Sequence, residues 1–171
     1  MKKLLILATT LLMGLGLAAQ ETGCHFVQNQ TRRGETVRME GILFFAEPDL
    51  IRMNYLDPKG DYMILDETMV RSRFAGQARD ISVEKDARAR IFRAAFVYAY
   101  TGKTDALAKE MDAEVSEKAA GGERTVTVTP RRQPQVRGSV TRVQATYDAQ
   151  GRATRIVLEQ GRGSSEYLFD Y

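Results

Sequence analysis

Residues 44–66 read FFAEPDLIRMNYLDPKGDYMILD, and this stretch decides the class of fold. Two apolar runs, 50–56 and 62–66, each follow a turn that contains proline. Short apolar runs bounded by Pro, Gly and Asp are typical of β-strands joined by tight turns. The stretch therefore predicts consecutive antiparallel strands. Arg52 places a single guanidinium inside the first apolar run, and its role there needs an explanation.

The same pattern continues on both sides of this stretch. Residues 25–31 and 37–47 read as two strands around a turn at Arg33–Gly34, and residues 69–75 read as a further strand. Short connections between successive strands are typical of an antiparallel meander. We therefore expect a meander over residues 26–75.

The composition changes in the middle of the chain. Residues 83–118 are rich in Ala, Lys and Glu, and apolar side chains recur at helical spacing, with Phe92 and Phe96 widening the stripe. Gly102 breaks this pattern, and Thr104 is a residue that can cap a second helix. We expect a helical insertion over about 83–118, and ordinary packing of its apolar stripe on the sheet is the simplest reading.

Strand patterns return after the helical segment. The expected strands and turns are 124–130, 138–148, a turn at 149–151, 152–160, a turn at 161–163, and 164–171. Strands on both sides of a helical insertion predict an α+β fold with one antiparallel sheet and helices on one face. No internal repeat is evident, so residues 21–171 are expected to form a single domain.

The first 20 residues have the pattern of a secretory signal peptide. Lys2 and Lys3 precede an apolar run and a small-residue end near Ala19, and the run is short for a membrane span. Two of the 25 basic residues and none of the 22 acidic residues lie in this segment, so its removal lowers the net charge from +3 to +1. This charge gives poor support for nucleic-acid binding, and none is expected.

The sequence offers few residues for catalysis or metal binding. It has one His and one Cys, adjacent at Cys24–His25, which cannot build a usual zinc site or a catalytic triad. No phosphate-binding glycine motif is present. We therefore expect no enzyme activity, no cofactor and no metal. Lipidation of Cys24 is disfavoured by the charged Glu21 before it, and the alternative is a free thiol near a mobile N-terminus.

Several short patterns together resemble those of a known family. They are F-x-Q at 26–28, G-x-L-x-F at 41–45, the segment Pro48 to Arg52 closing on Tyr55, a Thr-Pro pair at 129–130, and an Asp-x-x-Gly turn at 148–151. In this order, from Phe26 to the C-terminus, they resemble LolA-type periplasmic lipoprotein carriers. The chain is similar to a divergent, compact member of that family.

The resemblance implies a fold and a function. The fold would be a strongly curved antiparallel sheet, an incomplete barrel, with helices covering its concave face. The protein would be a periplasmic carrier that shields lipoprotein acyl chains between the inner and outer membranes. Its partners would be an inner-membrane ABC-type release complex and an outer-membrane acceptor, with transient membrane-surface contact, and the protein would be a monomer. The alternatives are an adaptor or sensor that binds a protein, and a carrier of another acyl cargo.

The resemblance also implies a set of cargo-binding or lid-binding residues. The family's lid arginine falls on Arg52, while the alternation along 50–56 leaves open which face it occupies. Exposure on the outer face, or pairing with Asp49, remains the alternative for Arg52. The full set comprises Arg52, Leu43, Phe45, Leu50, Ile91, Phe92, Phe96 and Leu107. Only about five residues separate Gln20 from Phe26, so the family's N-terminal lid helix is expected to be missing.

Overall fold

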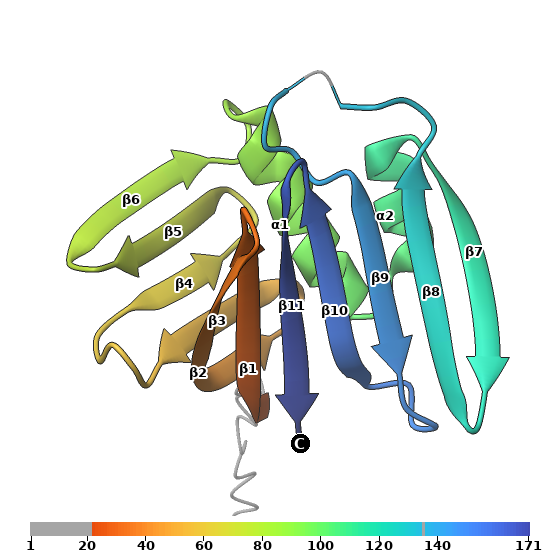
Figure 1. The fold of residues 1–171 in the computed structure, drawn as a ribbon, viewed down its shortest axis with the longest axis horizontal. Coiled ribbons are helices and arrows are strands. Elements are labelled where there is room, and N and C mark those ends of the chain that lie inside the picture. Colours follow the sequence, from red (N-terminus) through yellow and green to blue (C-terminus); the bar gives the residue numbers. More distant parts are fainter. Residues whose placement is uncertain (1–21, 135) are drawn as a thin grey trace, which may run out of the picture.

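The computed structural model describes residues 22–134 and 136–171. They form one antiparallel sheet and two helices (Figure 1). The first six strands are β1 (Thr22–Arg32), β2 (Glu35–Ala46), β3 (Leu50–Tyr55), β4 (Tyr62–Leu65), β5 (Met69–Phe74) and β6 (Gln77–Ser82). The helices are α1 (Ala87–Tyr100) and α2 (Thr104–Met111). The last five strands are β7 (Ala113–Ala120), β8 (Glu123–Pro130), β9 (Arg142–Tyr147), β10 (Ala153–Gln160) and β11 (Gly163–Asp170).

The sheet is an open meander in two halves. Its 11 strands follow the order β6-β5-β4-β3-β2-β1-β11-β10-β9-β8-β7, so every neighbour except one pair is also consecutive in sequence. The exception is the antiparallel pairing of β1 with β11, which joins the two halves. The edge strands β6 and β7 do not pair, so the barrel is incomplete. The expected α+β class, with one curved antiparallel sheet and helices, is confirmed.

Both helices lie against the concave face of the sheet (Figure 1). Helix α1 begins after Asp86, whose carboxylate accepts hydrogen bonds from the backbone N–H groups of Arg88 and Ala89. It contacts β5 and β6 from one half and β9 and β10 from the other, while α2 contacts β7 and β8. The curved sheet therefore wraps around α1, which packs against both halves.

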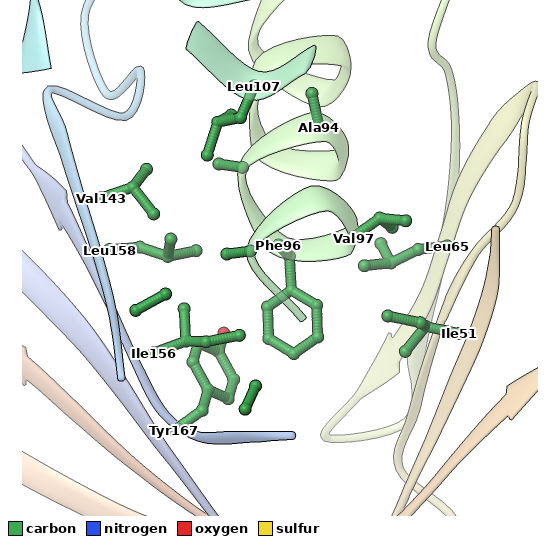
Figure 2. Close-up of a cluster of buried hydrophobic side chains, with 14 of the residues drawn as sticks. Ile51, Leu65, Ala94, Phe96, Val97, Leu107, Val143, Ile156, Leu158 and Tyr167 are labelled. Carbon is green, nitrogen blue, oxygen red and sulfur yellow. The ribbon is translucent and has the colours of Figure 1, made fainter. Parts of the chain in front are cut away.

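The core lies between α1 and the sheet. In Figure 2, Phe96 points toward Tyr167 and Ile156, while Val97 points toward Leu65 and Ile51 on the other half. All six of these side chains are 1% exposed or less. The Phe96 and Tyr167 rings meet edge to face with centroids 4.7 Å apart, a favourable aromatic geometry. Side chains from both halves of the sheet thus meet on one helix.

The expected helical insertion is too long at its C-terminal end. Helix α2 ends at Met111, and strand β7 (Ala113–Ala120) includes residues 113–118, which were expected to be helical. Asp112 adopts a left-handed conformation with φ 45° and stops the helix. The Ala, Glu and Lys content favours a helix, but full pairing with β8 overrides that local preference. Thr104 is the first residue of α2 and not its cap, and strand β6 was not predicted from the sequence.

The proposed signal peptide, residues 1–20, lies outside the described residues. Cys24, expected near a mobile terminus, instead lies in β1 with 5% exposure. Its Sγ lies 3.7 Å from the Tyr100 hydroxyl of α1, and burial raises the pKa of the thiol. A group attached to this sulfur would have to displace the Tyr100 hydroxyl.

The buried thiol leads to a prediction about reactivity. We expect Cys24 to react with a small alkylating reagent more than about 100-fold more slowly in the native protein than in urea, because reaction needs the thiolate and local opening of β1. A time course of iodoacetamide labelling followed by mass spectrometry measures both rates. Equal rates would contradict the packing of β1 against Tyr100.

Candidate functional site

An apolar pocket opens where α1 ends against the rim of the sheet. It has a volume of about 520 Å³, within the range of about 300–1,000 Å³ that is usual for small-molecule sites. The turn after β2, the C-terminal end of α1, the β9–β10 turn and the residue after β11 form its walls. The lining residues are Phe45, Glu47, Pro48, Tyr100, Thr101, Lys103, Gly151, Arg152 and Tyr171.

A row of aromatic rings leads from this pocket into the core. The ring of Phe45 lies 5.9 Å from that of Tyr100, and Tyr100 lies 5.2 Å from Phe169 in β11. Phe169 then lies 6.4 Å from Phe96, and Phe96 lies 6.5 Å from Phe92, both on α1. The pocket is therefore continuous with an apolar, aromatic layer along the inner surface of the helix.

Three polar side chains of the pocket, Tyr100, Arg152 and Tyr171, have buried or paired polar groups. Burial raises the pKa of the Tyr100 hydroxyl far above its usual value, and the neighbouring Tyr171 adds to this rise. The Tyr171 hydroxyl donates to the carbonyl of Ala153 at 3.0 Å. Arg152 pairs with Asp148 at 2.8 Å and stacks on the Tyr171 ring at 4.8 Å. The rim can therefore orient a polar head group, while the interior favours an apolar chain.

A polar clamp fastens α1 to the rim beside the pocket. Arg93 of α1 has 8% side-chain exposure, its Nε donates to the carbonyl of Asp66 at 3.0 Å, and its Nη2 lies 3.6 Å from Asp49 Oδ2. Lys103, just after α1, donates to Asp49 Oδ1 at 2.7 Å. Asp49 and Asp66 belong to the turns that follow β2 and β4. The clamp therefore ties the helices to the β1–β6 half of the sheet.

Most of the residues proposed from the sequence lie on the concave side. Leu43, Phe96 and Leu107 are fully buried in the core. Phe45, Ile91 and Phe92 are partly buried and pack against that core. Phe45 is the one member of the predicted set that lines the pocket.

Arg52 and Leu50 lie on the opposite face, so of the two placements that the sequence left open for Arg52, the structure has the outer one. The side chains of Ile51 and Met53 are fully buried, and strand alternation puts Leu50 and Arg52 outside. The Arg52 guanidinium stacks on the ring of Phe44 in β2, at 4.8 Å. The sequence contained the deciding signal, since the set with Ile51, Met53 and Tyr55 is more apolar than the set with Arg52 and Asn54.

The arginine that does contact the sheet from the helices is Arg93. Its side chain is buried, although a charged residue beside the apolar stripe of a helix usually lies in solvent. Tyr100, Tyr171 and Asp49 were likewise not proposed as site residues. Their roles depend on contacts between segments far apart in the chain, which spacing within one element cannot reveal.

Within the described parts of the chain, no group of three or more His, Cys, Asp or Glu side chains is placed to hold a metal ion. No helix in those parts is both long enough and apolar enough to span a membrane.

No protein-family model and no curated protein matches the chain. Solved structures that match it include a LolA superfamily protein from Nitrosomonas europaea, at 9% identity and a TM-score of 0.40, with 90% of this chain and 86% of that chain covered. A putative outer membrane lipoprotein-sorting protein domain from Vibrio parahaemolyticus matches at 11% identity and a TM-score of 0.45, covering 88% and 83%.

The lipoprotein LppX from Mycobacterium tuberculosis matches at 10% identity and a TM-score of 0.36, covering 88% of this chain and 85% of that chain. These three similarities extend over most of both chains, at identities of 11% or less.

Proposed function

We propose that the protein is a periplasmic carrier that takes up acyl chains beneath α1 and α2. The observation that carries this proposal is the apolar pocket beside the C-terminal end of α1, which continues as a row of aromatic rings along that helix. An acyl chain that enters between Phe45 and Tyr100 would meet Phe169 and then Phe96. Each CH₂ group transferred from water to such surroundings contributes about 0.8 kcal/mol.

Uptake of a long chain requires α1 to move. Phe96, Val97 and their neighbours fill the space between helix and sheet, so a long chain cannot enter while α1 keeps this position, and in the proposed carrier this closed form would be the one without cargo. The closed form keeps a large apolar surface away from water when no cargo is bound. The clamp of Asp49 with Arg93 and Lys103 would be the polar contact that breaks when the helices lift.

The cargo we propose is the acylated end of a lipoprotein, or a similar lipidated molecule. The corresponding partners are an inner-membrane ABC-type complex that releases the cargo and an outer-membrane acceptor. Mass spectrometry of lipids bound to protein purified from its host tests the cargo class. An N-acylated cysteine peptide would support the lipoprotein, whereas another acyl compound would select the alternative carrier.

Phe45 and Leu50 form a matched pair for testing acyl binding. We expect Phe45→Lys to weaken binding of a fluorescent fatty acid by at least about tenfold, because it puts a charge into the wall of the pocket. Leu50→Lys, on the outer face and already 38% exposed, should leave the affinity unchanged. Fluorescence titration of the wild type and both variants measures the three dissociation constants.

Two results would count against the carrier. The first is absence of fatty-acid binding by the wild type, which would favour a protein-binding adaptor or sensor. The second is equal loss of affinity in both variants, which would place the probe outside the pocket. Circular dichroism of the variants controls for their folding.

A further inference from the structure

A second groove lies at the end of the sheet opposite to the apolar pocket. Strand β2 begins at this end and finishes at the pocket. The β1–β2 and β10–β11 hairpin turns lie there together with loop residues Arg137 and Gly138, in the upper part of Figure 1. The groove has a volume of about 740 Å³. Its lining residues are Gln30, Thr31, Arg32, Arg33, Arg137, Gly138, Gln160, Gly161, Arg162, Gly163, Ser164 and Ser165.

The groove gathers arginine side chains that form no ion pairs within the described residues. Four of its lining residues are arginines, and none is Asp or Glu. Within residues 22–134 and 136–171, Arg32, Arg33, Arg137 and Arg162 make no ion pair, although many other arginines of the chain do. The four side chains come from two hairpins and one loop, so the tertiary fold brings these charges together.

The remaining lining groups suit a phosphate. Thr31 and Ser164 supply hydroxyl groups, and Gly138 and Gly161 have open space where a side chain would lie, so their backbone is accessible. An arginine guanidinium group can donate two parallel, charge-assisted hydrogen bonds to two oxygens of one phosphate group. The lining therefore has the chemistry of a site for phosphate groups.

Exposed aliphatic side chains accompany this charge. Val37, opposite Gln30 in the β1–β2 ladder, is 58% exposed, and Val136, next to Arg137, is 45% exposed. Basic side chains with nearby exposed apolar ones are typical of segments that contact the surface of an anionic membrane. A protein with an acidic surface is the alternative partner. Such a partner would explain the arginines of the groove but not the exposure of Val37 and Val136 beside them.

We propose that this end of the protein docks on anionic membranes and that the arginine groove binds phospholipid phosphate groups. The groove and the apolar pocket lie at opposite ends of the sheet. Docking through the groove therefore does not require acyl cargo in the pocket, and it is a property in addition to the proposed carrier function. Docking would hold the protein at a membrane surface with its pocket directed away from it.

Vesicle co-sedimentation tests the proposal. Vesicles of phosphatidylcholine alone are compared with vesicles that also contain phosphatidylglycerol, using the full chain without its proposed signal peptide. We expect binding to the anionic vesicles only, and about 20-fold weaker partitioning for Arg32→Gln/Arg162→Gln, since each arginine contributes severalfold near an anionic surface. High salt should weaken binding by the wild type.

The matched control removes the same charge elsewhere. Arg73→Gln/Arg79→Gln alters two exposed arginines in the β5–β6 hairpin, away from the groove, and should keep most of the binding. Equal losses in the two double variants would overturn the site, because net charge alone would explain the binding. Absence of binding to anionic vesicles would overturn membrane docking. This holds even if calorimetry shows that the groove binds inorganic phosphate, because the site would then take a free phosphate and not a membrane. Acyl binding measured on the same samples tests the carrier function separately.

Discussion

Gly41→Ala is expected to destabilise the protein by about 3 kcal/mol, which lowers the melting temperature by about 10 °C. Gly41 lies in β2 between Phe26 of β1 and Tyr55 of β3. A Cβ at this position would lie 2.7 Å from Phe26 Cε1, and it would also collide with the backbone carbonyl of Asn54. The backbone of a central strand cannot yield without disturbing both ladders, so the ring of Phe26 would have to move.

Displacement of Phe26 would spread through a buried aromatic group. Its ring packs edge to face on Tyr55 at 5.3 Å, and the Tyr55 hydroxyl donates to Gln28 Oε1 at 2.6 Å. Urea unfolding followed by circular dichroism measures the free energy of unfolding. Gly23→Ala in the neighbouring strand is the control, because its Cβ would lie at ordinary contact distances, 3.4 Å from the Phe44 ring and 3.5 Å from the Leu43 carbonyl oxygen, and we expect less than about 1 kcal/mol. Equal stabilities of the two variants would refute the close approach at Gly41.

Asp49→Ala is expected to cost about 2–3 kcal/mol because it leaves the Arg93 guanidinium buried without its counter-ion. Arg93→Met should cost only about 1 kcal/mol, because it removes the charge but keeps most of the buried side-chain volume. The double variant should then be about as stable as Arg93→Met alone. Chemical unfolding of the wild type, the two single variants and the double variant gives the coupling energy.

The size of the expected energy change distinguishes the buried clamp from an ordinary surface ion pair. Glu117→Ala breaks a pair with Arg124 in which both side chains are at least 40% exposed, and we expect a change below about 0.5 kcal/mol. The Lys103–Asp49 pair is partly exposed on the lysine side and adds little. Additive effects of Asp49→Ala and Arg93→Met would show that the two residues do not act as one clamp.

The clamp and the pocket lie side by side, and Lys103 belongs to both. The groups that hold the helices down are therefore next to the entrance proposed for the cargo. Binding at that entrance would act directly on the contacts that keep α1 in place. This proximity supports the proposed carrier with a helical lid over the alternative of a rigid adaptor surface.

The local features of the fold could be read from the sequence. The apolar runs at 25–31 and 50–56 predicted strands, which the structure has as β1 (Thr22–Arg32) and β3 (Leu50–Tyr55), and the Arg33–Gly34 turn is present with φ values of 53° and 87°. The apolar stripe with Phe92 and Phe96 marked helix α1. These features depend on neighbours within a few positions, which is the range over which turn geometry and side-chain periodicity act.

What the sequence by itself determined is the alternation of strands, the central helices and the supply of apolar residues for a curved sheet. The tertiary structure alone decided that residues 113–120 pair with β8 as a strand, because the pairing energy of a neighbouring strand outweighs local helix preference. It also decided that Arg93, and not Arg52, clamps the helices, since Asp49 and Asp66 reach Arg93 only after the sheet has curved around α1. Contacts of this kind join segments that are distant in sequence, so they are properties of the folded chain.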